Sequence, residues 1–423
     1  MPLRADNFYL SVQPISGPIA PMKQAARRHY GSHPYFTKRA WNVVQEYIKT
    51  FSQAGDVVLD PFGGSGVTAV EALVLRRRAI HVDISPLANF LCHETAVAPV
   101  DLNAMSEGFE QVEQACKEEI QSLYKLMPRQ LARKKIKYWY PHGIKLPQNA
   151  DVETVEELFT RRQLIALSTL WHAIGEIKAP IIRGLLQFCF SGTLAKINRT
   201  FLSAAGRAES RGGSSIFSVY RYNVPQSPVE LNAWDQFAMR FKRLLCAKKE
   251  TNDEIGSFHS GENLAVIQGS ATELERYLEP ESVDYIYTDP PYGGNIAYLD
   301  LSTMWNAWLG FQVTQRDKQL EAIEGGDLGK TQQQYVDLLG ESIRQMYRVL
   351  KFNRWMSLVF MHRDPAYEDA IVQVAQRAGF EHVNTAMQPV GIVWSMHKKK
   401  NPLTVLSGER VMNFRKAYNF AVA

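Results

Sequence analysis

Residues 289–292, Asp-Pro-Pro-Tyr, place a carboxylate, two prolines and an aromatic ring directly after an apolar run. That run contains Val283, Tyr285 and Ile286 and has the pattern of a short buried strand. Because proline cannot donate a hydrogen bond to a sheet, the strand is predicted to stop at Asp289. Ligands of open α/β sheets bind at the carboxyl ends of strands, so this stiff loop is a candidate catalytic site.

A second candidate site is the loop of residues 60–66, Asp-Pro-Phe-Gly-Gly-Ser-Gly. Its glycines let the backbone turn tightly and approach a ligand that a side chain would exclude. Asp83 ends the next predicted strand, about 20 residues further on, where an acid can bind ribose hydroxyls. The loop is neither a Walker loop nor the spaced glycine motif of dinucleotide enzymes. It therefore predicts another kind of nucleoside cofactor site, or else a purely structural turn between a strand and a helix.

Alternating strand and helix patterns must position these two loops. Strands are predicted at 56–60, 79–84, 264–268, 283–287, 355–361 and 390–396, and helices at 67–78, 332–350 and 366–379. This alternation predicts an α/β fold with a mainly parallel, doubly wound sheet and helices on both faces.

The stretch between the second and third predicted strands breaks this rhythm. It contains long helical patterns and a glycine- and serine-rich segment, residues 206–228, which is predicted to be a long loop. We therefore predict three parts: a lead-in and cofactor-binding half at 1–100, a mostly helical insertion at 101–260, and a catalytic half at 261–423.

The two loops together resemble a known family. The segments DPFGGSGVT (60–68) and DPPY (289–292) are similar to two motifs of the S-adenosylmethionine-dependent amino-methyltransferases of DNA. The segment HPYFTKRAWNVVQEYI (33–48) resembles the lead-in and helix that complete the family's cofactor pocket. The segment at 295–310 resembles a subgroup of bacterial adenine-specific methylases associated with phage defence and restriction-modification. The resemblance implies a Rossmann-like sheet of about seven strands.

The resemblance also implies roles for individual residues. Asp289 and the carbonyl of Pro290 would accept hydrogen bonds from an exocyclic amine, and Tyr292 would stack on the base. The expected catalytic residues are Asp289, Pro290, Pro291 and Tyr292. The expected residues for binding S-adenosylmethionine are Asp60, Pro61, Phe62, Gly63, Gly64, Gly66, Asp83, Ser270 and Thr37. Ser270 departs from the family, which usually has an acid there that contacts the cofactor's adenine.

The charge pattern indicates a polyanionic partner. The net charge is +5, and the chain from Lys178 to Arg221 has seven basic residues with a single acid. Basic groups contact phosphate and flexible loops can enter a groove, although a solvated helix face is the other interpretation. The candidate nucleic-acid-binding residues are Lys196, Arg199, Arg207, Arg211, Arg221 and Asn295. The expected partner is double-stranded DNA with a flipped base, with a nuclease or other defence subunits as further candidates.

Composition narrows the class of protein further. Of 423 residues, 45% are hydrophobic and 22% are charged, which are ordinary values for a globular protein. We expect neither a membrane span nor a signal peptide, because the necessary apolar runs are missing. The four cysteines, Cys92, Cys116, Cys189 and Cys246, lack metal-ligand spacing. The prediction is a cytoplasmic protein with free thiols and no metal.

Several functions remain open at this point. The leading prediction is methylation of adenine N6 in DNA, because Asp-Pro-Pro-Tyr is more typical of adenine enzymes than of N4-cytosine enzymes. Methylation of cytosine N4 in DNA is one alternative, and methylation of the N2 amine of guanine in RNA is another, since such RNA enzymes also use this motif. An alternative of another class is a non-catalytic nucleic-acid-binding subunit whose methyltransferase fold has decayed, which Ser270 would suggest.

Overall fold

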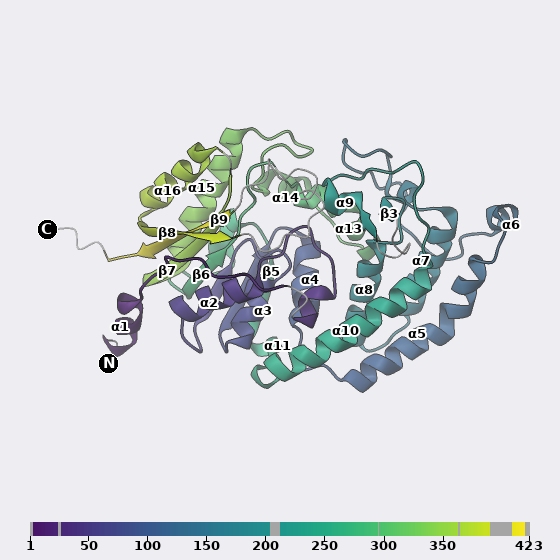
Figure 1. Cartoon of the computed structure of the whole chain (residues 1–423), viewed down its shortest axis with the longest axis horizontal. Helices are drawn as coiled ribbons and strands as arrows, with labels where there is room; N and C mark the ends of the chain where they lie inside the picture. The colour runs from purple at the N-terminus through teal and green to yellow at the C-terminus, as the bar shows by residue number, and fades with distance from the viewer. Residues whose placement is uncertain are drawn as a thin grey trace.

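The computed structural model describes residues 3–23, 27–203, 212–294, 296–362, 364–389 and 408–418. A seven-stranded sheet occupies one side of the molecule and a mainly helical body the other (Figure 1). Across the sheet the strands follow the order β5 (Leu264–Gln268), β2 (Arg78–Asp83), β1 (Val57–Asp60), β6 (Val283–Thr288), β7 (Leu350–Phe360), β9 (Gly408–Lys416) and β8 (Glu381–Pro389).

The sheet is mainly parallel, as the sequence predicts. The first five strands in this order pair in parallel, and β9 is antiparallel to both of its neighbours. The order reverses its direction between β1 and β6, which makes the fold doubly wound and creates a switch point at the carboxyl ends of these two strands. The predicted fold class is therefore confirmed.

Each face of the sheet has its own hydrophobic core, because successive side chains of a strand point to opposite faces. Val58 and Tyr285 pack on one face with residues of α2 (Trp41–Phe51) and α3 (Val67–Val74). Leu59 and Ile286 pack on the other face with residues of α15 (Gln332–Val349) and α16 (Pro365–Ala378). The central strands β1 and β6 are buried on both faces, which explains their nearly continuous apolar sequences.

One predicted helix needs correction, and one predicted strand lies outside the described residues. The helix predicted at 67–78 ends at Val74, because Arg76 has a φ of 64° that an α-helix cannot contain, and Arg78 already begins β2. The strand predicted at 390–396 lies outside the described residues. The sequence pattern did not reveal β8 or β9, which lie on either side of that segment.

The helical body is built from four long helices between β2 and β5 in the chain. These are α5 (Leu102–Leu123), α7 (Arg161–Gly175), α8 (Pro180–Leu194) and α10 (Ala233–Ile255), and they share one hydrophobic core. The same core includes α13 (Thr303–Leu309), which follows the Asp289 loop in the chain. The helical body thus packs directly on the segment after the candidate catalytic loop. The division of the chain into three domains stays a prediction.

Shorter elements complete the described parts of the chain. The helices are α1 (Leu3–Ser11), η2 (Arg28–Gly31), α4 (Pro86–Ala96), α6 (Pro128–Arg133), η3 (Val155–Leu158), α9 (Ser215–Ser218), η4 (Gly256–Phe258), α11 (Ser260–Asn263), η5 (Ala271–Arg276), α12 (Tyr298–Leu301) and α14 (Gln315–Leu320). A two-stranded ribbon is formed by β3 (Phe201–Ser203) and β4 (Gly212–Ser214). Within the described ranges, no helix is both long enough and apolar enough to span a bilayer.

Candidate active site

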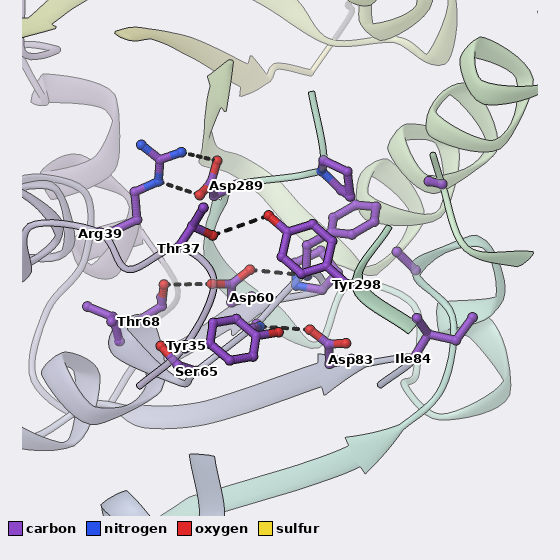
Figure 2. Close-up of a pocket in the computed structure, with 18 of the residues that line it drawn as sticks. Tyr35, Thr37, Arg39, Asp60, Ser65, Thr68, Asp83, Ile84, Asp289 and Tyr298 are labelled. Carbon is purple, nitrogen blue, oxygen red and sulfur yellow. Dashed lines mark hydrogen bonds and ion pairs between the residues drawn. The ribbon is translucent and has the colours of Figure 1, made fainter. Parts of the chain in front are cut away.

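The candidate site is a cavity at the carboxyl ends of β1, β2 and β6. These neighbouring parallel strands end at Asp60, Asp83 and Thr288, so their terminal acids and Asp289 meet at one edge of the sheet. The cavity has a volume of about 830 Å³, including the solvent space at its mouth. Figure 2 shows the acids side by side along this edge, with Tyr35 and Tyr298 beside them.

Most of the predicted site residues line this one cavity. The lining includes Thr37, Asp60, Pro61, Phe62, Gly63, Gly64, Asp83, Ser270, Asp289 and Pro291. Gly66, Pro290 and Tyr292 are predicted site residues that do not belong to the lining. The glycine turn and the Asp289 loop are more than 200 positions apart in the chain, yet they face the same space. The roles of these residues stay predictions.

The glycine turn has a backbone that side chains would not allow. Gly66 precedes α3 with a φ of 85°, and a Cβ there would lie 2.7 Å from the sulfur of Cys92. A Cβ on Gly63 would lie 2.1 Å from Nδ1 of His81. The backbone N–H of Gly64 donates to Oδ2 of Asp83 at 2.7 Å. The glycines therefore bring the loop into direct contact with the end of the neighbouring strand.

Asp60 joins the three elements that meet at the cavity. It accepts hydrogen bonds from Oγ1 of Thr68 at 2.6 Å, from the backbone N–H of Phe62 at 3.2 Å and from Oγ1 of Thr288 at 3.0 Å. Figure 2 shows Asp60 between Asp289 and Asp83. Burial raises the pKa of this carboxyl to about 7, despite these hydrogen bonds.

Two other lining carboxyls are also hard to ionise. Asp83 accepts from the N–H of Gly64 and, at 2.8 Å, from that of Ser85, and burial raises its pKa to about 6. Glu321 accepts from the N–H of Leu299 at 3.0 Å, and burial raises its pKa to about 7. Sequence analysis did not find Glu321, because it belongs to no motif and only the fold brings it to the cavity.

Asp289 is held by an arginine that the sequence analysis did not single out. Nε of Arg39 donates to Oδ2 of Asp289, and its Nη2 donates to Oδ1 at 2.6 Å (Figure 2). Nη1 of Arg39 forms an ion pair with Glu409. Burial lowers the pKa of the guanidinium, but Asp289 and Glu409 outweigh burial and hold it well above its usual value. Arg39 lies within the lead-in segment 33–48 that resembles the family.

Tyr292, the residue predicted to stack on the base, does not belong to the lining of the cavity. The ring of Tyr292 packs edge-on against Phe360 at a centroid distance of 5.2 Å, and its hydroxyl donates to Oδ1 of Asp289 at 2.5 Å. Tyr35 and Tyr298 do line the cavity, and their rings are stacked with centroids 6.3 Å apart. The hydroxyl of Tyr298 is 3.2 Å from Oγ1 of Thr37. Tyr35 and Tyr298 are therefore also positioned to contact a planar ligand.

The predicted nucleic-acid-binding residues are only partly described. Arg207, Arg211 and Asn295 lie outside the described residues. Arg199 donates to the backbone carbonyl of Glu157, and Arg221 pairs with Asp151 at 2.5 Å. Burial lowers the pKa of Lys196, at the end of α8, to about 8. Both described arginines thus have partners within the helical body, and the nucleic-acid role of the whole set stays a prediction.

Comparison with known proteins gives a family match to the front half of the site. Residues 18–88 match the family model described as DNA methylase, of the N6/N4 type. This range includes the lead-in segment, the glycine turn and Asp83.

Two curated relatives extend the similarity over most of the chain. The type II methyltransferase M.MjaII of Methanocaldococcus jannaschii is 22% identical over 420 residues, which cover 87% of this chain and 78% of the relative. The type II methyltransferase M.MvaI of Kocuria varians is 21% identical over 313 residues, covering 71% of this chain and 61% of the relative.

Likeness to solved structures is weak. TrmN from Thermus thermophilus is 10% identical with a TM-score of 0.31, covering 89% of this chain and 48% of that one. The [4+2]-cyclase SpnF is 9% identical with a TM-score of 0.34, and the match covers 95% of this chain and 99% of SpnF. The fold assignment therefore rests on the strand order of this chain itself. The matched segment and the two relatives support kinship with the N6/N4 DNA methylase family, and they do not distinguish adenine from cytosine.

Proposed function

We propose that this chain transfers the methyl group of S-adenosylmethionine to the N6 amine of adenine in DNA, as part of a restriction-modification or phage-defence system. The observation that carries the proposal is the shared cavity, which both the glycine turn and Asp289 line. The names of the two relatives, both type II methyltransferases, support the same reaction class.

The charges of the cavity suit S-adenosylmethionine, which carries a sulfonium and an ammonium group. Four carboxyls line the cavity, those of Asp60, Asp83, Asp289 and Glu321, against two basic side chains, Lys38 and Arg39. Arg39 is already paired with two acids, and burial lowers the pKa of Lys38 to about 7. The lining therefore has more carboxyl groups than basic groups, and a cationic ligand would favour the ionised forms of these carboxyls.

Residues of this chain would hold the cofactor along the glycine turn. A Cβ on Gly64 would lie 3.4 Å from the ring of Tyr35 in the lining, so this glycine leaves room for the cofactor, and Asp83 at the end of β2 can accept hydrogen bonds from ribose hydroxyls. When bound, the cofactor supplies an activated methyl group on its sulfonium. The methyl donor would thus lie beside the Asp289 loop, and positioning would supply much of the rate.

Asp289 would activate the acceptor amine. An exocyclic amine is a poor nucleophile because its lone pair is delocalised into the ring. Hydrogen bonds from the amine to the Asp289 carboxylate and the Pro290 carbonyl favour a tetrahedral nitrogen, in which the lone pair is localised. These bonds strengthen as positive charge develops on the nitrogen, so they stabilise the transition state more than the ground state.

The target base must leave the duplex before it can reach this cavity. Base flipping costs a few kcal/mol, which stacking on an aromatic ring offsets by about 1–3 kcal/mol. Tyr35 and Tyr298 are candidates for this contact because they line the cavity, and Tyr292 is the candidate that the motif indicates. The adenine preference is supported by the Asp-Pro-Pro-Tyr motif and by the resemblance of the segment at 295–310 to adenine-specific methylases.

The helical body between β2 and β5 is the proposed DNA-contacting part. Lys196 and Arg199 supply positive charge there, and Arg207, Arg211 and Arg221 belong to the same basic sequence pattern. A nuclease or another defence subunit is a proposed partner, which the type II relatives suggest.

The direct test is Asp289→Asn, assayed with labelled S-adenosylmethionine and duplex DNA. We expect a loss of methyl transfer of about 100-fold or more, as for the removal of a transition-state hydrogen bond elsewhere. The affinity for S-adenosylmethionine should stay within about threefold, since the glycine turn is unchanged. Asp337→Asn, on the exposed side of α15, is the matched control and should retain activity. Full activity of Asp289→Asn would contradict the proposal, and transfer to RNA alone would favour the RNA alternative.

A further inference from the structure

The structure assigns a positioning role to Arg39: its guanidinium fixes the orientation of the Asp289 carboxylate, and Glu409 holds Arg39 in place. This inference rests on the proposed function, because that function makes Asp289 the acceptor for the target amine. It adds two residues from distant parts of the chain to the catalytic machinery.

Arg39 donates hydrogen bonds to both oxygens of the Asp289 carboxylate. It lies directly before α2, and its Nε and Nη2 donate in parallel to Oδ2 and Oδ1 of Asp289. A planar guanidinium fork matches a carboxylate in this geometry and prevents it from rotating. Nη2 also contacts the hydroxyl of Tyr292, which itself donates to Oδ1 of Asp289. The acid and the tyrosine of the Asp-Pro-Pro-Tyr motif are therefore oriented by the same side chain.

This arrangement limits how a substrate can approach. A carboxylate has about four acceptor positions, and the hydrogen bonds from Arg39 and Tyr292 occupy three of them. Among the contacts of the described residues, one position on Oδ2 remains for the N–H of an amine. Asp289 lines the cavity and its side chain is 19% exposed, so the carboxylate faces the space that a base would enter. A fixed acceptor with one remaining position would select a single approach of the amine.

Glu409 gives the group formed by Arg39, Asp289 and Glu409 a net negative charge. Arg39 pairs with Asp289 and, through Nη1, with Glu409 at the start of β9. The three side chains together carry one net negative charge, whereas Arg39 and Asp289 alone would be neutral. The second acid also fixes the guanidinium from its far side. Asp289 can therefore be held by a cation and still leave negative charge at the cavity, where positive charge develops on the amine.

The alternative is that Arg39 has only a structural role and connects the lead-in segment to β9 through its ion pair with Glu409. Substitution by lysine separates the two roles, because lysine keeps the charge but cannot make the parallel pair of hydrogen bonds. A structural tie would show in thermal stability and in cofactor affinity. A positioning role would show in kcat, with the affinity for S-adenosylmethionine and the KM for DNA little changed.

The experiment compares Arg39→Ala, Arg39→Lys and Glu409→Gln in the full chain. We expect kcat to fall about 100-fold for Arg39→Ala and by a similar factor for Arg39→Lys, because small displacements of a reacting group have effects of this size. Glu409→Gln should cause a smaller loss. Added guanidinium ion at low millimolar concentration should restore part of the activity of Arg39→Ala but none of that of Arg39→Lys. Arg415→Ala, which removes an ion pair with Glu381 further along β9, is the matched control.

Two outcomes would overturn the inference. One is a normal kcat for Arg39→Ala. The other is a loss of kcat that guanidinium does not restore and that accompanies lost cofactor binding, which would indicate a structural tie. Failure of the proposed function is recognised separately, since Asp289→Asn would then be active. A fully active Arg39→Ala beside an inactive Asp289→Asn would remove the role of Arg39 alone.

Discussion

Three carboxyls of the cavity, Asp60, Asp83 and Glu321, remain partly protonated near neutral pH. Burial raises their pKa values to about 7, 6 and 7. In the unfolded chain the pKa values of such groups are about 4, so the folded state binds protons more tightly. The stabilisation from these bound protons is fully present below about pH 4 and is lost as the pH rises through 6 to 7. A cationic ligand beside these carboxyls would favour their ionised forms.

The affinity for S-adenosylmethionine should therefore increase with pH. Between about pH 5.5 and 8 the three carboxyls ionise, and their negative charge attracts the sulfonium and ammonium groups. Calorimetry across this range should show a rising affinity and a release of protons on binding below pH 7. Glu321→Gln should weaken this dependence, while Glu262→Gln, on the short surface helix α11, should leave it unchanged. An affinity independent of pH would contradict the charge argument.

At the level of single elements, the turn before α3 is the most constrained part of the site. Gly66 combines a φ of 85° with a backbone that approaches Cys92 closely, so a Cβ has neither the conformation nor the space. The turn fixes the start of α3 and the position of the N–H of Gly64 against Asp83. A substitution at Gly66 should therefore affect both stability and the cofactor site.

Gly66→Ala should destabilise the protein by about 2–4 kcal/mol, from left-handed strain together with overpacking. It should also weaken binding of S-adenosylmethionine. Gly175→Ala is the control: Gly175 is exposed at the end of α7, and a Cβ added there would meet no atom within 4 Å, so this change should not destabilise. Urea unfolding of both variants measures the difference. Equal stability of the two variants would show that the turn tolerates a side chain.

The elements that could be predicted from sequence are those whose signal is local. Strands β1, β5 and β6 and the second half of β7 are short apolar runs, and the glycine turn and Asp289 lie in contiguous motifs. Strand β8 was missed because its residues are mostly polar and exposed, as expected near a sheet edge. Arg39, Tyr298 and Glu321 were missed as site residues because only the fold brings them to the cavity.

At the scale of the whole molecule, the helical body is joined to the segment that follows the proposed catalytic loop. Nε1 of Trp305 donates to the carbonyl of Ser191 in α8 at 2.9 Å, and the hydroxyl of Tyr222 donates to the carbonyl of Leu301 at 2.5 Å. Both contacts are buried within the shared core. DNA bound to the helical body would therefore be held at a fixed place relative to Asp289. Figure 1 shows this body extending well beyond the sheet, with α5 and α10 along one side.

The central claim is that one cavity brings a methyl donor to an amine of a DNA base, and that Asp289 accepts a hydrogen bond from that amine. The most direct measurement is nucleoside mass spectrometry, with single-molecule sequencing, of DNA from a methylation-free host that expresses this chain or its Asp289→Asn variant. We predict N6-methyladenine at one recurring sequence with the wild-type chain and none with the variant. N4-methylcytosine would correct the base but keep the mechanism. DNA without any methylated amine would contradict the account.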